Sequence, residues 1–105
     1  MTFVVPHRLW SACLLVLAGL STWGCASAPV QEMSDARQAI KAAREAGAET
    51  VVPHKLSEAQ QLLQRAEESL QRRAYRDARR NAIAAHDKAA EALGQAQTAS
   101  RHESS

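Results

Sequence analysis

The final third of the chain repeats a small residue at every helical step, and this pattern limits the possible folds most strongly. Intervals of three and four residues, without a miss, separate Tyr75, Ala78, Ala82, Ala85, Ala89, Ala92, Ala96 and Ala99. We call the seven alanines of this series the alanine seam. Such spacing predicts one amphipathic helix over residues 75–97. Alanine along the buried face allows an unusually close approach of a neighbouring helix.

Alanine also limits how much apolar area this chain can bury. Hydrophobic residues make up 46% of its 105 residues, but 22 of them are alanines and only 4% of the chain is aromatic. Alanine buries little area, so a wide, deeply packed core and a large catalytic domain are both excluded. One small all-α domain is expected.

Two earlier segments carry the same periodicity. In the first, Met33, Ala36, Ile40 and Ala43 share a face and Gly47 suits the C-terminal cap, which predicts a helix over 31–46. Residues 51–53 (Val-Val-Pro) are expected to be extended, because the residue before a proline avoids the helical region. A second helix then begins at Pro53, which suits a first turn, or at Ser57, which can form a capping box with Gln60. Its predicted apolar face comprises Leu56, Ala59, Leu63, Ala66 and Leu70, with Leu62 beside them.

The apolar faces before and after residue 72 are out of phase. Continued past Leu70, the second face would include Arg73 and Asp77, whereas the seam begins at Tyr75 and Ala78. We therefore expect a tight turn at 72–75 and an antiparallel hairpin, with Ile83, Ala90 and Leu93 widening the seam. The predicted fold class is all-α: an N-terminal signal helix, then two to three helices ending in this Ala-rich hairpin. The polar tail, residues 98–105, is expected to be disordered.

The first 25 residues read as an export signal. Arg8 precedes an apolar run from Ala12 to Leu20, and the run leads to Gly24-Cys25. This ending resembles the lipobox of bacterial lipoproteins, which implies lipidation of Cys25. The predicted organisation is a signal peptide at 1–24, a lipidated tether at 25–30, a helical domain at 31–97 and the tail.

Two alternatives to lipidation stay open. Residues 26–28 (Ala-Ser-Ala) satisfy the rule for ordinary signal peptidase, which would release a soluble exported chain. Leu9 to Ala28 also gives 20 residues without a formal charge, about one membrane span. Each alternative places the rest of the chain outside the cytoplasm. Cys13 would leave with a cleaved signal, so the mature body would contain no disulfide.

Several short motifs resemble a bacterial envelope family known as domain of unknown function 4398. They are Ser34-Asp35-Ala36-Arg37, residues 42–49, Pro53, residues 56–60 and Tyr75-Arg76-Asp77-Ala78-Arg79. Members are short Ala-rich lipoproteins or modules beside peptidoglycan-binding domains. The resemblance implies a helical hairpin like a tetratricopeptide unit, and it supplies no catalytic residues. Ala26, directly after the lipobox cysteine, implies sorting to the outer membrane by resemblance to Gram-negative lipoproteins.

The sequence offers no residues for catalysis, for a cofactor or for a metal ion. His54, His86 and His102 lack the spacing of a ligand set, and no Gly-rich phosphate loop is present. Ser57 reads as a cap rather than a nucleophile. We therefore expect a non-enzymatic chain.

Arginine is concentrated around the predicted turn. The cluster comprises Arg65, Arg72, Arg73, Arg76, Arg79 and Arg80. An anionic partner could bind there, such as lipopolysaccharide, peptidoglycan or an acidic envelope protein. Ordinary solvation is the alternative, with Glu68 pairing with Arg72 and Arg73 with Asp77 at i+4 spacing. A formal charge of +2 does not demand a nucleic-acid partner.

The seam also suggests self-association, since it could pack against a second copy. The expected function is thus a binding or spacer module at the periplasmic face of the outer membrane, anchored through a lipid at Cys25. The alternative is a single-span, inner-membrane-anchored periplasmic protein that self-associates.

Overall fold

Four helices account for nearly all of the chain that the structure describes. This computed structural model describes residues 28–104, so the expected signal helix and Cys25 lie outside the described residues. The helices are α2 (Val30–Glu45), α3 (Ala48–Val51), α4 (Pro53–Gln71) and α5 (Tyr75–Ser104). Between residues 28 and 104 there is no β-strand. The all-α prediction is confirmed for this part of the chain.

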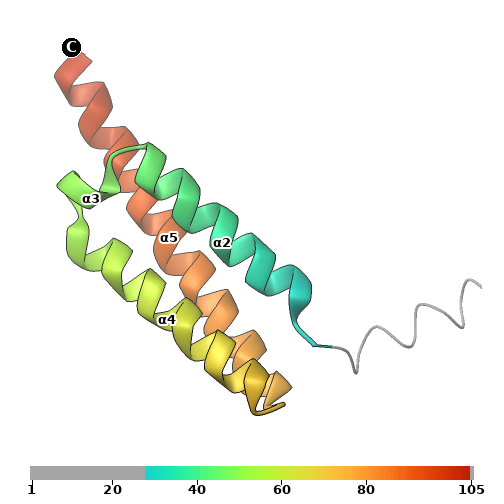
Figure 1. Cartoon of the computed structure of the whole chain (residues 1–105). Coiled ribbons are helices and arrows are strands. Elements are labelled where there is room, and N and C mark those ends of the chain that lie inside the picture. Colours follow the sequence, from blue (N-terminus) through green and yellow to red (C-terminus); the bar gives the residue numbers. More distant parts are fainter. Residues whose placement is uncertain (1–27, 105) are drawn as a thin grey trace, which may run out of the picture.

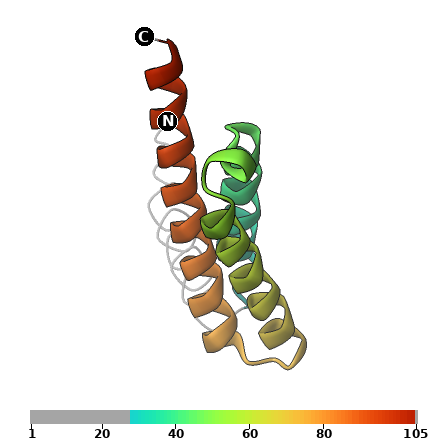
Figure 2. The ribbon, with the colours of Figure 1, turned by 90° about the vertical axis from the view of Figure 1, so that its left-hand side faces the viewer.

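Helix α5 is the common neighbour of the other helices. It lies against both α2 and α4, and these two also touch each other. Helices α4 and α5 form the expected antiparallel hairpin, and α2 runs in the same direction as α5 (Figure 1). The last turns of α5 extend past the level of α3 (Figure 2). The hairpin is therefore completed by a third long helix on the same seam.

The alanine seam lies at the centre of this packing. Relative exposure is 0% to 1% at Ala78, Ala82, Ala85, Ala89, Ala92 and Ala96. The facing residues of α2 are buried as predicted, namely Met33, Ala36, Ile40 and Ala43, and α4 buries Leu56, Ala59, Ala66 and Ser69. The sequence suggested that a second copy could pack on the seam, whereas here α2 and α4 of the same chain cover it.

The seam is narrower than the sequence indicated. Ile83 is 46% exposed, Tyr75 is 37% exposed and Ala90 is also exposed, so the expectation that Ile83 and Ala90 widen the seam is wrong. Successive residues on a helix diverge by about 100°, so Ile83 turns away from the line of Ala82. Leu93 is half-buried and packs against the core.

The break between α2 and α4 contains one short helix. Gly47 caps α2 in the left-handed region, with φ 93°, as expected for a C-terminal glycine. Its carbonyl accepts hydrogen bonds from the backbone N–H of Thr50 and Val51, so Val51, predicted to be extended, instead ends a short helical turn. Val52 is non-helical, with φ −137° and ψ 61°, as the rule for the residue before a proline predicts, and α4 begins at Pro53 and not at Ser57.

The turn between α4 and α5 is a Schellman motif with arginine at the position usually held by glycine. The N–H of Ala74 donates to the carbonyl of Ser69 at 2.8 Å, and the N–H of Arg73 donates to that of Leu70 at 2.9 Å. Arg73 has φ 61°, and among residues 28–104 no other non-glycine residue has a positive φ. The predicted break at 72–75 is confirmed, since α4 ends at Gln71 and α5 begins at Tyr75.

Single substitutions at the two left-handed positions, Arg73 and Gly47, should change the free energy of unfolding in opposite directions. Arg73→Gly should raise the free energy of unfolding by about 1 kcal/mol, because glycine adopts positive φ without a Cβ clash. Gly47→Ala should lower it by a similar amount. A Cβ added at Gly47 meets nothing within 4 Å, so the loss there comes from the backbone alone. Urea denaturation followed by circular dichroism measures both. A loss of stability in Arg73→Gly would contradict the turn described here.

The expected disordered tail is instead helical. Helix α5 continues to Ser104, past residue 97 where the sequence analysis ended it. Two hydroxyls support these turns: Thr98 Oγ1 donates to the carbonyl of Gly94 at 2.9 Å, and Ser104 Oγ donates to that of Ser100 at 3.0 Å. After Gly94 no glycine or proline interrupts the helix, and Gln, Ala, Arg and Glu favour it.

Candidate functional site

The turn gathers the predicted arginine cluster at one end of the hairpin. Arg65 lies on α4, Arg72 and Arg73 lie in the turn, and Arg76, Arg79 and Arg80 lie on the first two turns of α5. We call these six residues, with the turn that joins them, the arginine end. Arg76 and Arg80 are four residues apart on one face of α5, whereas Arg72 precedes the start of that helix.

Arg79 differs from the other five arginines because it holds two helices together. Its Nε donates to Glu32 Oε1 at 3.1 Å, and the side chains of the two residues are 35% and 32% exposed. Glu32 lies in the first turn of α2 and Arg79 in the second turn of α5. The pair therefore fixes the start of α2 beside the start of α5.

The remaining five guanidiniums make no ion pair and no hydrogen bond within residues 28–104. The expected pairs Glu68–Arg72 and Arg73–Asp77 are not formed. Arg73 is left-handed and separates α4 from α5, so Arg73 and Asp77 lack the i+4 geometry of one continuous helix. The backbone N–H of Arg72 still donates to the carbonyl of Glu68 at 3.2 Å, but the two side chains make no ion pair. Glu68 Oε1 instead accepts a hydrogen bond from Gln64 Nε2 at 3.5 Å.

Four basic side chains elsewhere on the body do find acidic partners. These are the pairs Arg37–Glu67 (3.3 Å), Arg44–Glu49 (2.8 Å), Lys55–Glu91 (3.1 Å) and Lys88–Glu58 (3.6 Å). Such exposed pairs contribute little to stability. They do neutralise the surface locally, which leaves the arginine end as the concentrated positive charge of residues 28–104.

The charge is therefore uneven along the module. Residues 30–37 and 65–80, which meet at the arginine end, together carry seven arginines against five carboxylates, an excess of two positive charges. At the opposite end, residues 41–58 and 91–104 together carry four Lys and Arg against five Asp and Glu, an excess of one negative charge. The two ends would experience opposite forces near a charged surface.

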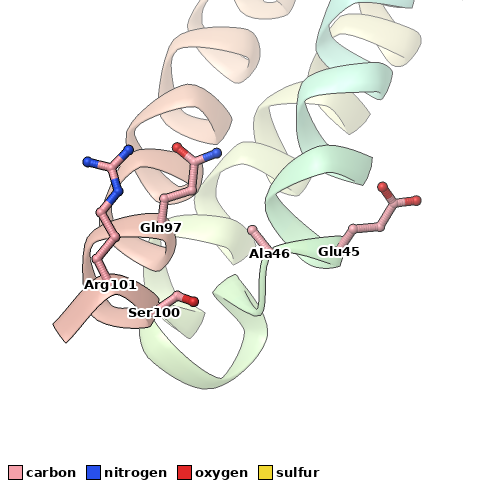
Figure 3. Close-up of a pocket in the computed structure, with 5 residues that line it drawn as sticks. All are labelled: Glu45, Ala46, Gln97, Ser100 and Arg101. Atoms are coloured by element: carbon pink, nitrogen blue, oxygen red, sulfur yellow. The ribbon is translucent and has the colours of Figure 1, made fainter. Parts of the chain in front are cut away.

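Two pockets lie between α2 and α5. One of about 100 Å³ is lined by Glu32, Asp35, Ile83 and His86. A larger one of about 400 Å³ is lined by Glu45, Ala46, Gln97, Ser100 and Arg101. In the larger pocket the Glu45 and Arg101 side chains are directed away from each other, as Figure 3 shows. Polar side chains line both pockets, but the smaller one is below the roughly 300–1,000 Å³ of a small-molecule site. In the larger one the two charged side chains do not converge.

Three further features are the predicted lipidation site, possible metal ligands and possible membrane-spanning helices. Cys25, the expected lipidation site, lies outside them. Among residues 28–104 no three His, Cys, Asp or Glu side chains are grouped to hold a metal ion. None of the helices in this range combines the length and hydropathy of a membrane-spanning segment.

Sequence reasoning missed the contact between Glu32 and Arg79. These residues are 47 positions apart, and they meet only because α2 and α5 run in the same direction. The sequence contained a weak signal for the pair, since each follows the start of a predicted helix. It did not contain the direction in which the two helices would pack.

The family model described as Domain of unknown function (DUF4398) matches residues 31–104. No curated protein and no solved structure matches the chain. The matched range covers all but the first residue of α2 and every residue of α3, α4 and α5. The chain therefore belongs to the DUF4398 family.

Proposed function

We propose that this chain is a non-enzymatic lipoprotein, anchored through Cys25 at the periplasmic face of the outer membrane. Its helical module would act as a binding or spacer unit of the cell envelope. The observation that carries this proposal is the Gly24-Cys25 pair at the end of the apolar run. Ala26 supports the outer membrane over the inner one through the resemblance to sorted lipoproteins.

The spacer role is supported by the dimensions of α5. A helix of 30 residues is about 45 Å long, and its whole middle section is held against α2 and α4. A second copy cannot use the alanine seam, which is already covered. Self-association would need another surface.

Replacing the lipidation residue tests the anchor. Cys25→Ser should abolish acylation, leave the chain unprocessed and remove it from the acylated outer-membrane fraction. Intact mass and sucrose-gradient fractionation of envelopes measure these effects. Cys13→Ser is the matched control, because Cys13 lies within the segment that lipoprotein processing removes, and it should change neither the mature mass nor the membrane fraction.

Intact mass also separates the alternatives. A mature chain that starts at acylated Cys25 supports the lipoprotein. A chain that retains Met1 supports the single-span, inner-membrane-anchored protein suggested by the uncharged stretch from Leu9 to Ala28. A soluble chain cleaved after Ala28 would overturn both.

A further inference from the structure

We propose that the arginine end lies on the anionic phospholipid headgroups of the membrane to which the chain is anchored. The lipid phosphates would be bound by the five arginines that have no partner in the described structure, Arg65, Arg72, Arg73, Arg76 and Arg80. The inference rests on the proposed membrane anchor, and it adds an orientation and a chemical partner to it.

The chain enters the helical body at the arginine end. Helix α2 begins at Val30, and the Glu32–Arg79 pair places this start beside the start of α5 (Figure 1). Pro29 is fully buried, so the point of entry is fixed to the body. From Cys25 to Ala28 there are three residue steps, which reach at most about 11 Å in any conformation. A lipid on Cys25 would therefore hold the arginine end within a short distance of the headgroups.

The same conclusion follows if the chain is anchored by an uncleaved span. That span would also join the body at Ala28. The orientation depends on where α2 begins and not on the chemistry of the anchor.

The chemistry of the arginine end fits phosphate. A guanidinium donates paired hydrogen bonds to phosphate oxygens and is weakly hydrated, so it loses little on leaving bulk water. Near an anionic leaflet, each basic residue strengthens association about fivefold. The guanidiniums need not break internal ion pairs to bind, because none of the five makes one with residues 28–104.

The rest of the module favours the same orientation. Helices α2 and α5 both begin at the arginine end, and the N-terminus of a helix carries a partial positive charge. The opposite end has the excess of negative charge described above. An anionic surface would thus attract one end and repel the other.

Site-specific crosslinking tests the contact. A photoreactive residue, Gln71→p-benzoylphenylalanine, is placed in the exposed last residue of α4, and a matched probe replaces exposed Ser100 near the far end of α5. The membrane-purified chain is reconstituted in phosphatidylcholine vesicles with or without phosphatidylglycerol. The readout is the fraction of chain that gains the mass of a phospholipid. We expect at least a fivefold higher fraction at position 71 than at 100 with phosphatidylglycerol, and a decrease with added salt.

Charge reversal at the two ends provides the matched comparison. Arg72→Glu/Arg76→Glu should reduce the lipid adduct at position 71 to the level found at 100. Lys41→Glu/Arg44→Glu, an equal change of charge toward the other end, should leave it unaltered. Circular dichroism verifies the fold of each variant, since all four side chains are exposed.

The outcomes separate this inference from the anchor. Equal lipid adducts at 71 and 100, or adducts insensitive to phosphatidylglycerol, overturn the contact even when Cys25 is acylated. Crosslinking of position 71 in intact envelopes to protein or peptidoglycan, in place of lipid, also overturns it. Lipid adducts at 71 on a chain without acyl groups support the contact and refute the lipoprotein.

Discussion

Leucine in place of Ala89 is expected to lower the free energy of unfolding by about 3 kcal/mol. Ala89 has 0% exposure and packs in one cluster with Ile40, Ala43 and Leu56. The three additional carbons have no space, because the helices are in close contact through alanine side chains. They must therefore displace α2 or α4. Overpacking of a filled core typically costs about 1–3 kcal/mol. We expect a cost near the upper end of this range, because the helices are closely packed at Ala89.

The neighbouring residue gives a control with identical chemistry. Ala90 is one step further along α5 and exposed, so Ala90→Leu should change stability by no more than about 0.5 kcal/mol. Thermal and urea unfolding of the two variants provide the comparison. Equal destabilisation by the two leucines would show that helix propensity, and not close packing on the seam, limits the substitution.

The opposite change at Leu56 should have an effect of similar size. Leu56 is 2% exposed, whereas the other leucines among residues 28–104 are only partly buried. Leu56→Ala removes three carbons from the main cluster, and its alanine neighbours have no flexible side chains to fill the gap. We expect a loss of about 3 kcal/mol, within the range for buried leucine truncation.

Ile83→Ala is the control for this truncation. Ile83 is 46% exposed on α5, so its loss should cost less than about 1 kcal/mol. Denaturation midpoints in urea, at constant slope, give both values. If truncation at Ile83 costs as much as at Leu56, the buried face of α5 has been assigned incorrectly.

The helices could be predicted where a local rule was sufficient. The 3,4 spacing of alanines located the buried face of α5, and the phase change after Leu70 located the turn, although Arg73 is a poor residue for it. The short helix α3 could not be predicted, because it depends on hydrogen bonds to the carbonyl of Gly47 that compete with the extended preference before Pro53. The tail was misread because its polarity concealed good helix propensity.

The candidate site was visible in composition but not in arrangement. Six arginines in sixteen residues could be counted in the sequence. Whether they pair with Glu68 and Asp77 depended on the exact geometry of the turn. The position of Glu32 beside Arg79 depended on the direction of α2, which no local pattern contains.

The direction of α2 also determines how this module would bear a pulling force. The chain enters at the start of α2 and its last described helix, α5, ends at the opposite end of the bundle. Tension between these points would slide α2 along α5, so the contacts along their shared seam would resist together. A simple two-helix hairpin held at its two open ends would instead peel apart one contact at a time. The third long helix thus converts an unzipping geometry into a shearing one.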